Sequence, residues 1–303
     1  MKVLVTGGAG FIGSHIVDLL VEQDHRVIVV DDLSTGRREN VHPAATFVEL
    51  DIAAAGLAAI FEHHQPTAVV HQAAQPSVPR SIQEPVLDTR TNILGTVNLL
   101  HCCRRFGVQR FTFASSAAVY GEPEMIPLPE TATTRPLSPY GLAKLAGEGY
   151  LDLFHRLDGL ETIVLRYANV YGPRQDAHGE AGVVSIFIDR VLAGERPVIH
   201  GDGCQTRDFV YVGDIARANV MALEPGAPTG IYNAGSGLAT SVAELFDLIA
   251  AGRVEPLQGP PRPGDIRHSV LNSALIGRAL GWRAETPLPV GLAATLAHFA
   301  RMD

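Results

Sequence analysis

Short apolar runs alternate with segments of helical periodicity through the first half of the chain. Runs rich in valine, isoleucine and phenylalanine are typical of buried strands, whereas apolar residues that recur every three or four positions are typical of helices packing one face on a core. On this basis strands are predicted at residues 3–5, 27–30, 46–50, 68–71, 111–114 and 162–166, and helices at about 11–20, 53–64, 84–106 and 140–157.

This alternation predicts an α/β fold, a doubly wound parallel sheet of the Rossmann type. In such sheets, ligands bind where the carboxyl ends of the strands meet. Polar residues follow three predicted strands at that edge, with Asp51 after one, Gln72 and Gln75 after the next, and Ser115 and Ser116 after a third. We therefore expect several loops to converge on one cleft.

Glycine and proline become frequent beyond residue 170 and separate shorter predicted elements. A second, smaller substrate-binding lobe is expected there, and its helix near 213–223 is expected to return to the first domain. The predicted division is a dinucleotide-binding domain at 1–169 and an interleaved lobe at 170–303. Helices of this second half are predicted at about 183–194, 213–223, 241–251 and 273–280.

A glycine-rich turn joins the first predicted strand to the first predicted helix. Gly7, Gly10 and Gly13 permit positive φ angles and let the backbone approach a pyrophosphate, while the helix N-terminus attracts the anion. Asp31-Asp32 closes the second strand, 18 residues after Gly13, where a carboxylate can accept hydrogen bonds from an adenosine ribose. The arrangement predicts a dinucleotide cofactor.

The charge of Asp31 favours NAD over NADP, because a carboxylate repels a 2′-phosphate. Arg37 and Arg38 act in the opposite sense, since two arginines could neutralise that phosphate. They follow Ser34-Thr35-Gly36, a sequence typical of a turn, which is expected to carry them into solvent. NAD is therefore the expected cofactor.

Tyr140 and Lys144, four residues apart, lie on one face of the predicted helix 140–157. A phenol with a pKa near ~10 is a poor base at neutral pH, but a neighbouring ammonium favours the phenolate and is expected to lower that pKa. Close to a dinucleotide, such a pair is suited to removing the proton of an alcohol.

Composition and charge exclude several other classes of protein. The chain has 303 residues and a net charge of −8, which argues against non-specific binding to nucleic acid. It has no uninterrupted run of 18 apolar residues, so no membrane span is expected. No signal peptide or disulfide framework is expected either, which predicts a cytoplasmic location, and no histidine shows the spacing of a metal ligand. Candidate cations for an anionic substrate are Arg166, Arg174, Arg207 and Arg262.

Several further motifs follow the order and spacing of one enzyme family. They lie at residues 71–75 (HQAAQ), 115–121 (SSAAVYG), 165–174 (LRYANVYGPR), 201–203 (GDG), 206–209 (TRDF) and 262–265 (RPGD). With the glycine turn and Tyr140-x-x-x-Lys144, the chain resembles, over almost its whole length, the UDP-glucose 4-epimerase branch of the extended short-chain dehydrogenase/reductase superfamily.

This resemblance implies an NAD-dependent enzyme that oxidises carbon 4 of a UDP-sugar transiently and reduces it from the opposite face. It implies Ser116 as a hydroxyl donor to the sugar, Tyr140 as the base, and Lys144 as its activator and a ligand of the nicotinamide ribose. Further implied cofactor contacts are Gly7, Gly10, Phe11, Ile12, Asp31, Asp32, Ser34, Thr35, Gly36, Asp51, Ile52, Gln72, Ala73, Ala74, Gln75, Asn92 and Tyr167, and the implied substrate contacts include Asn169, Val184 through its backbone, Arg207, Arg262, Asp265 and Ser269.

The resemblance also bears on the size of the sugar. In the family, the residue four positions after the aspartate of the RPGD motif borders the substituent at sugar position 2, and a tyrosine there restricts the pocket to plain hexoses. This chain has Ser269 at that position, so room for an N-acetyl group is expected.

Other functions remain open at this stage. Related 4,6-dehydratases and glucuronate decarboxylases carry acidic residues after the Ser116 position, whereas this chain has Ala117 and Ala118. That favours simple epimerisation, although a UDP-glucuronate 4-epimerase would use the same machinery. A non-catalytic NAD(H)-sensing protein is the alternative from another class, but it would not need Ser116, Tyr140 and Lys144 together.

The predicted helices 84–106 and 140–157 carry apolar residues on more than one face. Some of these residues must contact something other than the sheet. By the resemblance, we expect a homodimer formed through a four-helix bundle. The apolar residues considered are Val97, Leu99, Leu100, Leu142, Leu151 and Phe154.

Overall fold

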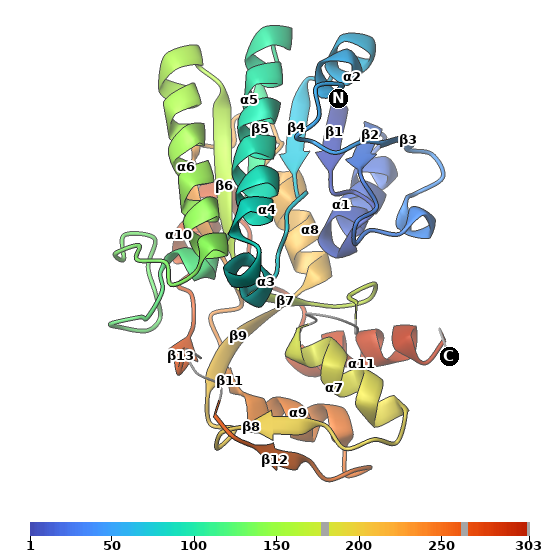
Figure 1. Cartoon of the computed structure of the whole chain (residues 1–303), viewed down its shortest axis with the longest axis vertical. Coiled ribbons are helices and arrows are strands. Elements are labelled where there is room, and N and C mark those ends of the chain that lie inside the picture. Colours follow the sequence, from blue (N-terminus) through green and yellow to red (C-terminus); the bar gives the residue numbers. More distant parts are fainter. Residues whose placement is uncertain (177–181, 262–265, 302–303) are drawn as a thin grey trace.

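The computed structural model describes residues 1–176, 182–261 and 266–301, and it confirms the expected α/β architecture. Seven parallel strands form the large sheet, and a smaller lobe lies beyond their carboxyl ends (Figure 1). The order across the sheet is β10-β6-β5-β4-β1-β2-β3. The strands are β1 (Lys2–Thr6), β2 (Arg26–Asp31), β3 (Thr46–Glu49), β4 (Ala68–His71), β5 (Arg110–Ser116), β6 (Glu161–Tyr167) and β10 (Gly230–Ala234).

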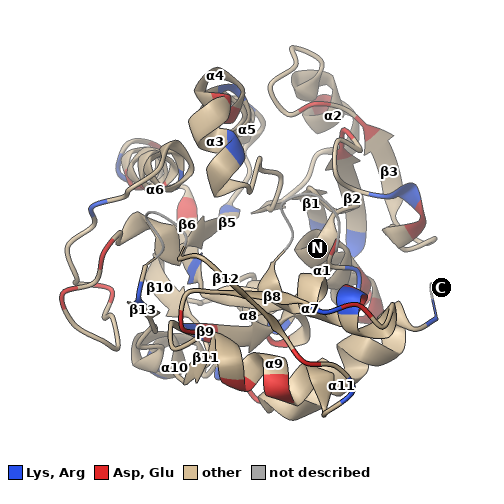
Figure 2. Ribbon diagram, turned by 60° about the horizontal axis from the view of Figure 1, so that its bottom comes forward, with Lys and Arg blue, Asp and Glu red and all other residues tan. Residues whose placement is uncertain are grey.

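Helices cover both faces of the large sheet with apolar side chains. Val3 and Val5 of β1 pack against α1 and α8 on one face, whereas Leu4 packs with α2, α5 and α6 on the other. This alternation follows from the two-residue period of a strand and buries the central strands on both faces. The helices are α1 (Phe11–Glu22), α2 (Leu57–His64), α5 (Gly95–Phe106), α6 (Pro139–Asp158), α8 (Val212–Met221) and α10 (Ala274–Leu280). The strands themselves carry few charges (Figure 2).

One helix from the second half of the chain packs on the large sheet. Helix α8, predicted at 213–223, packs alongside α1. The chain then adds β10, which pairs in parallel with β6 and forms the edge of the large sheet. Our sequence analysis did not predict β10, so the two halves of the chain are interleaved more closely than expected.

The helix predicted at 84–106 is broken into several pieces. Helix α3 (Val78–Gln83) ends at Glu84, and Pro85 starts α4 (Pro85–Thr89), because a proline fits the first turn of a helix but not its interior. A π-helical turn, η2 (Arg90–Leu94), then leads into α5. This turn carries the buried Asn92. The helix predicted at 53–64 likewise begins only at Leu57.

The smaller lobe combines short strands with three longer helices. The helices predicted at 183–194 and 241–251 are confirmed as α7 (Val183–Leu192) and α9 (Val242–Ala250), and α10 confirms the prediction at 273–280. Helix α11 (Leu288–Phe299) was not predicted, although it shares an apolar core with α7 and α9. The short strands are β7 (Asn169–Tyr171), β9 (Thr206–Tyr211), β11 (Ala239–Ser241) and β13 (His268–Ser269) in one sheet, and β8 (Val198–His200) and β12 (Leu257–Gly259) in another. Single 3₁₀ turns are η1 (Arg38–Asn40) and η3 (Ala117–Val119).

No helix in the described part of the chain is long and apolar enough to cross a membrane. The longest described helix, α6, has 20 residues and carries a mixture of charged and apolar side chains.

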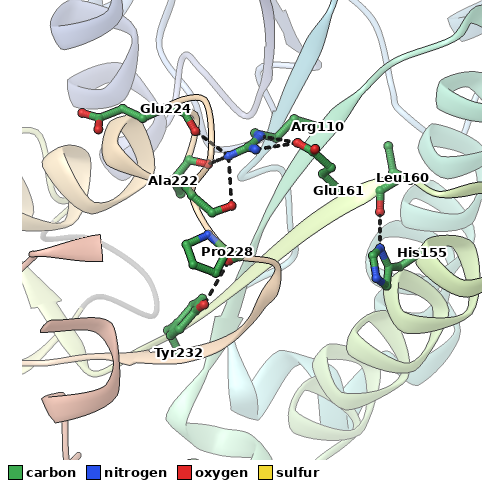
Figure 3. Close-up of polar contacts among 9 residues, drawn as sticks. Arg110, His155, Leu160, Glu161, Ala222, Glu224, Pro228 and Tyr232 are labelled. Carbon is green, nitrogen blue, oxygen red and sulfur yellow. Dashed lines mark hydrogen bonds and ion pairs between the residues drawn. The ribbon is translucent and has the colours of Figure 1, made fainter. Parts of the chain in front are cut away.

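Arg110, at the start of β5, ties the amino end of the sheet to α8 (Figure 3). Its side chain is only 8% exposed, and its Nη1 donates to the carbonyl oxygens of Ala222 at 3.0 Å and Glu224 at 2.7 Å. Its Nε donates to Glu161 at 2.9 Å. Carbonyls at the end of a helix lack partners within the helix. The guanidinium supplies these partners and fixes the returning helix to the sheet.

We predict that Arg110→Ala lowers the free energy of unfolding by about 2–4 kcal/mol, because buried carbonyls lose a charged donor. Urea unfolding monitored by circular dichroism measures this change. Arg156→Ala is the matched control, since Arg156 forms an exposed ion pair with Asp152 on α6 and its loss should change the free energy little. Equal destabilisation of the two variants would contradict this role of Arg110.

Candidate active site

A cavity of about 1360 Å³ opens at the carboxyl edge of the large sheet and extends to the smaller lobe. It exceeds the roughly 300–1,000 Å³ of a typical small-molecule pocket, so it has room for more than one ligand. Most of the predicted site residues that the structure describes line it. They are Gly7, Gly10, Phe11, Ile12, Asp31, Asp32, Ser34, Thr35, Asp51, Ile52, Gln72, Ala73, Ala74, Gln75, Ser116, Tyr140, Lys144, Tyr167, Asn169, Arg207 and Ser269.

Gly36, Asn92 and Val184 are predicted site residues that do not line the cavity. The Asn92 side chain is buried, and the Val184 side chain belongs to the apolar core of the smaller lobe, so Val184 can offer a ligand only its backbone. Two further predicted substrate contacts, Arg262 and Asp265, lie outside the described residues.

The glycine turn forms the cradle expected for a pyrophosphate. Gly7 has a φ of +67°, and a Cβ there would lie 2.6 Å from the backbone nitrogen of Ala73, so only glycine fits. No side chain caps α1, and Gly10, Phe11 and Ile12 at its start line the cavity. The N–H groups of this first turn are therefore available to an anion, which is what binding of a dinucleotide requires.

Asp31 is bound to the glycine turn more tightly than we expected. It is 6% exposed, its Oδ2 accepts from Ala9 N at 2.9 Å, and its Oδ1 accepts from Leu33 N at 2.9 Å. A Cβ on Gly36 would approach Oδ1 to 2.9 Å, so the turn closes directly on the carboxylate. Because each carboxylate oxygen can accept a second hydrogen bond, Asp31 can hold the turn and still meet a ribose hydroxyl.

The two arginines after this turn lie in different surroundings. Arg37 is exposed and borders the cavity, whereas the Arg38 guanidinium lies 4.3 Å from the centroid of the Phe47 ring. Stacking on Phe47 directs Arg38 away from the cavity. Only one of these two cations is therefore placed beside the adenosine end of the site.

Ser116 and Tyr140 meet because the start of α6 is pressed against the end of β5. Ser138 caps α6 by accepting from Gly141 N at 3.1 Å. A Cβ on Gly141 would lie 2.6 Å from the carbonyl oxygen of Ala118, so this close approach needs glycine. It places the Tyr140 hydroxyl near the Ser116 hydroxyl, which acts to lower the pKa of Tyr140.

The expected direction of the Tyr140 pKa is wrong for the protein without ligands. Desolvation raises the pKa of Tyr140 to about 12, although the hydrogen bond from Ser116 acts in the opposite direction. Lys144 Nζ lies 5.7 Å from the centroid of the Tyr140 ring. Desolvation, together with the negative charge of Asp88, therefore sets the direction of the Tyr140 pKa shift despite the nearby lysine.

Lys144 is itself buried, with 4% of its surface exposed. Burial lowers its pKa to about 8, while the negative charge of Asp88 acts to raise it. The ammonium also lies 5.0 Å from the centroid of the Phe113 ring, a position that favours a cation. Lys144 therefore remains charged near neutral pH by a small margin.

Arg166 is not an anion-binding residue, contrary to our expectation. Its Nη2 donates to Glu148 Oε2 at 2.6 Å, its Nε donates to Glu148 Oε1 at 2.9 Å, and both side chains are at most 5% exposed. Its Nη1 donates to the Tyr120 hydroxyl at 2.9 Å. The guanidinium is thus fully used within the protein. Arg174 and Arg207, by contrast, line the cavity as expected.

Sequence reasoning missed several residues that border or support the site. His298 and Phe299 of α11 and Ser77 and Val78 at the start of α3 line the cavity, and none belongs to a recognisable motif. Asp88 of α4 is buried below it. The signal that could have found it is an acidic residue within a predicted helix that carries apolar residues on more than one face. Within the described ranges, no group of three His, Cys, Asp or Glu side chains is arranged to hold a metal ion.

Comparison with known proteins agrees with this geometry. The model of the NAD dependent epimerase/dehydratase family matches residues 3–235. The UDP-glucose 4-epimerase of Thermotoga maritima, solved with UDP-glucose, is 47% identical, with a TM-score of 0.97 and coverage of 100% of this chain and 99% of that one.

Two other solved structures are similar over the whole chain. The UDP-glucose 4-epimerase of Thermus thermophilus, in complex with NAD, is 46% identical with a TM-score of 0.93, and the match covers 99% of both chains. The UDP-N-acetylglucosamine 4-epimerase of Methanobrevibacter ruminantium, in complex with UDP-N-acetylmuramic acid, is 37% identical with a TM-score of 0.95, covering 100% of this chain and 99% of that one. This chain belongs to the NAD dependent epimerase/dehydratase family.

Proposed function

We propose that this chain is an NAD-dependent UDP-glucose 4-epimerase, an isomerase that interconverts UDP-glucose and UDP-galactose. One observation carries the proposal: Ser116, Tyr140 and Lys144 converge in a cavity that also contains the glycine turn. The chain is also 46–47% identical, over nearly its whole length, to UDP-glucose 4-epimerases solved with UDP-glucose or with NAD.

The proposed chemistry assigns one task to each of the three residues. Tyr140 removes the proton of the sugar's 4-hydroxyl, Ser116 donates a hydrogen bond to the oxygen as charge develops on it, and Lys144 holds the ribose hydroxyls of the cofactor. When bound, NAD⁺ supplies the hydride acceptor and a positive charge beside Tyr140. Tyr140 returns its proton once the sugar presents its other face, and configuration at carbon 4 inverts.

The raised pKa of Tyr140 means that the proposed reaction requires positive charge close to this residue. A phenol whose pKa is about 12 does not act as a base at neutral pH. Positive charge near Tyr140 must lower that value, and Lys144 and the oxidised cofactor are the sources available to it. Proton removal is therefore confined to a site that already holds the oxidant.

Substrate binding is proposed to divide between the two lobes, with 1–169 holding NAD and 170–303 holding the nucleotide sugar. Arg207 on β9 and Asn169 on β7 line the cavity, and these two strands pair in parallel. Arginine offers a planar donor fork for a diphosphate. We propose that Arg207, together with Arg262 and Asp265, holds the UDP portion.

The sibling reactions are less well supported. Ala117 and Ala118, which follow Ser116, both line the cavity and offer no acidic group for chemistry beyond carbon 4. The carboxylate of Glu148 is also unsuited to that role, because it is occupied by Arg166 and by the Ser115 hydroxyl. A UDP-glucuronate 4-epimerase is the second candidate. Arg174 lines the cavity, but it already pairs with Asp18 at 2.7 Å, so a sugar carboxylate would have to share this arginine.

We also propose a homodimer, on a revised set of residues. Of the six apolar residues considered, Leu99, Leu100 and Leu151 belong to the core of the large sheet and do not face a partner. Leu142 is 58% exposed. Further along α6, the exposed apolar residues recur at helical spacing and form a stripe suited to a second copy, beside the neighbouring α5. The stripe consists of Leu142, Tyr150, Leu153 and Leu157.

We predict that Tyr140→Phe lowers kcat for UDP-galactose epimerisation at least ~100-fold with little change in UDP-sugar affinity, because only proton transfer is lost. Steady-state kinetics and calorimetric titration measure the two quantities. Tyr150→Phe, an exposed tyrosine on the same helix, is the control and should keep wild-type kcat. Near-normal turnover by Tyr140→Phe would refute the assignment.

We predict measurable turnover of UDP-N-acetylglucosamine beside UDP-glucose, with Ser269→Tyr abolishing the former selectively. Ser269 lines the cavity on β13, which pairs with β9 and places it next to Arg207. A tyrosine ring would fill the space needed by an N-acetyl group. The measurement is kcat/KM for both sugars, with Ser269→Ala as the small-residue control. Equal losses for both sugars in Ser269→Tyr would show that Ser269 is not the determinant.

We predict that wild-type protein sediments as a dimer and that Leu153→Glu/Leu157→Glu sediments as a monomer, because paired carboxylates cannot be buried between α6 helices. Analytical ultracentrifugation distinguishes the two states. Leu248→Glu, which alters an exposed leucine of α9 in the other lobe, is the matched control and should remain dimeric. A dimer that survives the α6 substitutions would place the interface elsewhere.

A further inference from the structure

A buried carboxylate lies below the active site and has no assigned role. Asp88 of α4 is 1% exposed, and its Oδ1 accepts from Asn92 Nδ2 at 2.8 Å and from Gln75 Nε2 at 3.1 Å. Its Oδ2 is also buried and has no hydrogen-bond partner among the described residues. A carboxylate in that condition is costly to bury unless a positive charge lies close to it.

Lys144 provides that positive charge. Helix α4 packs against α6, which carries Lys144. Lys144 is 4% exposed, lines the cavity, and has no hydrogen bond or ion pair to any described residue. The charge of Asp88 acts on Lys144 across this contact. Asp88 therefore has one carboxylate oxygen without a hydrogen-bond partner among the described residues, and the neighbouring helix carries an opposite charge.

Asp88 is held in place by a buried hydrogen-bonded chain. Asn92 Oδ1 accepts from Gln75 N at 2.9 Å, and Asn92 O accepts from the Thr96 hydroxyl at 2.7 Å. Because Thr96 donates there, it accepts from His71 Nε2, 2.9 Å away. Burial lowers the pKa of His71 well below its ordinary value, so the ring is neutral with its proton on Nε2. This series of hydrogen bonds links β4, η2 and α4.

The other groups near Lys144 do not compete with Asp88. Tyr140, on its own helix, is a neutral phenol at rest. His71 on β4 is neutral, because burial lowers its pKa. Phe113 on β5 contacts the Lys144 ammonium with the face of its ring and carries no charge. Glu148, four residues further along α6, is paired with Arg166. In the part of the chain that the structure describes, Asp88 is the anionic group that bears on Lys144.

We propose that Asp88 is a positioning residue of the active site, whose buried carboxylate keeps Lys144 in its ammonium form beside Tyr140. The inference rests on the proposed function, in which a charged Lys144 binds the ribose and assists Tyr140. Asp88 acts through Lys144 and does not itself contact the sugar. Asn92 and Gln75 hold its Oδ1, and Oδ2 has no hydrogen-bond partner among the described residues.

The chain offers an unusually direct test, because it contains only two lysines, Lys2 and Lys144. Protein labelled with ¹³C at the lysine Cε therefore gives two lysine signals, and Lys2→Arg assigns them. In wild type the Lys144 pKa is expected at about 8. Asp88→Asn keeps the shape and the two hydrogen bonds to Oδ1 but removes the charge, and should lower the Lys144 pKa by at least about one pH unit.

Controls separate charge from structure in this titration. Asp152→Asn makes the same chemical change at an exposed position of α6 and should leave the Lys144 pKa unchanged. Asp88→Glu keeps a carboxylate and should return the Lys144 pKa toward the wild-type value. If Asp88→Asn does not fold, Asp88→Ser also removes the charge and replaces it in the titration. A Lys144 pKa that is unmoved in the folded, uncharged variant would overturn the proposal.

A kinetic measurement supplies a second readout. The charge of Asp88 also raises the pKa of Tyr140, so its removal lowers the pKa of both Tyr140 and Lys144. In the NAD-loaded enzyme, the profile of kcat against pH should therefore move to lower pH in Asp88→Asn and not in Asp152→Asn. A loss of kcat that is uniform across pH would mean a purely structural role and would overturn the proposal.

The two tests also separate this inference from the proposed function. Wild-type protein that fails to epimerise UDP-galactose would refute the function, yet the lysine titration would still decide whether Asp88 maintains the charge of Lys144. A normal epimerase with an unmoved Lys144 pKa in Asp88→Asn would refute only the role of Asp88.

Discussion

The buried pair of Arg166 and Glu148 ties the helix that carries Tyr140 to the sheet beneath it. Glu148 lies two turns along α6 from Tyr140, and Arg166 lies near the carboxyl end of β6. Glu148 Oε1 also accepts from the Ser115 hydroxyl at 2.5 Å, one residue before Ser116. Breaking a buried ion pair leaves an uncompensated charge, so this contact strongly favours the observed placement of α6. The distance between Ser116 and Tyr140 depends on it.

The same guanidinium extends this constraint to the other half of the chain. Arg166 donates to the Tyr120 hydroxyl, which donates to Asn233 Oδ1 at 2.7 Å. The backbone nitrogen of Asn233 in turn donates to Glu130 at 2.9 Å. The loop before α6 and the edge strand β10 are thereby joined to the buried pair. This explains why β10, contributed from beyond residue 170, belongs structurally to the first domain.

Most of the large sheet could be predicted from the sequence because the signals for its strands are local. Long apolar strands, a glycine turn and the four-residue spacing of Tyr140 and Lys144 can be recognised without knowing what surrounds them. Strand β10 and the two- and three-residue strands of the smaller lobe carry no such pattern, since their pairing is decided by distant partners such as β6 and β9. Arg166 was misassigned for the same reason. The sequence does not distinguish an arginine that binds a phosphate from one that pairs with a buried glutamate such as Glu148.

The ionisation states of Tyr140 and Lys144 are the property of the site that residue spacing predicts least well. The spacing of Tyr140 and Lys144 correctly placed them together, but desolvation, which depends on the whole fold, raises one pKa and lowers the other. Only two of the 24 lysine and arginine residues are lysines, and one of them is Lys144. Arginine would stay charged there without help, whereas a buried lysine titrates near the working pH and depends on its surroundings. The buried Asp88 and the neutral His71 are surroundings of the kind that such a lysine requires, so the polar network below the site belongs with the catalytic residues above it.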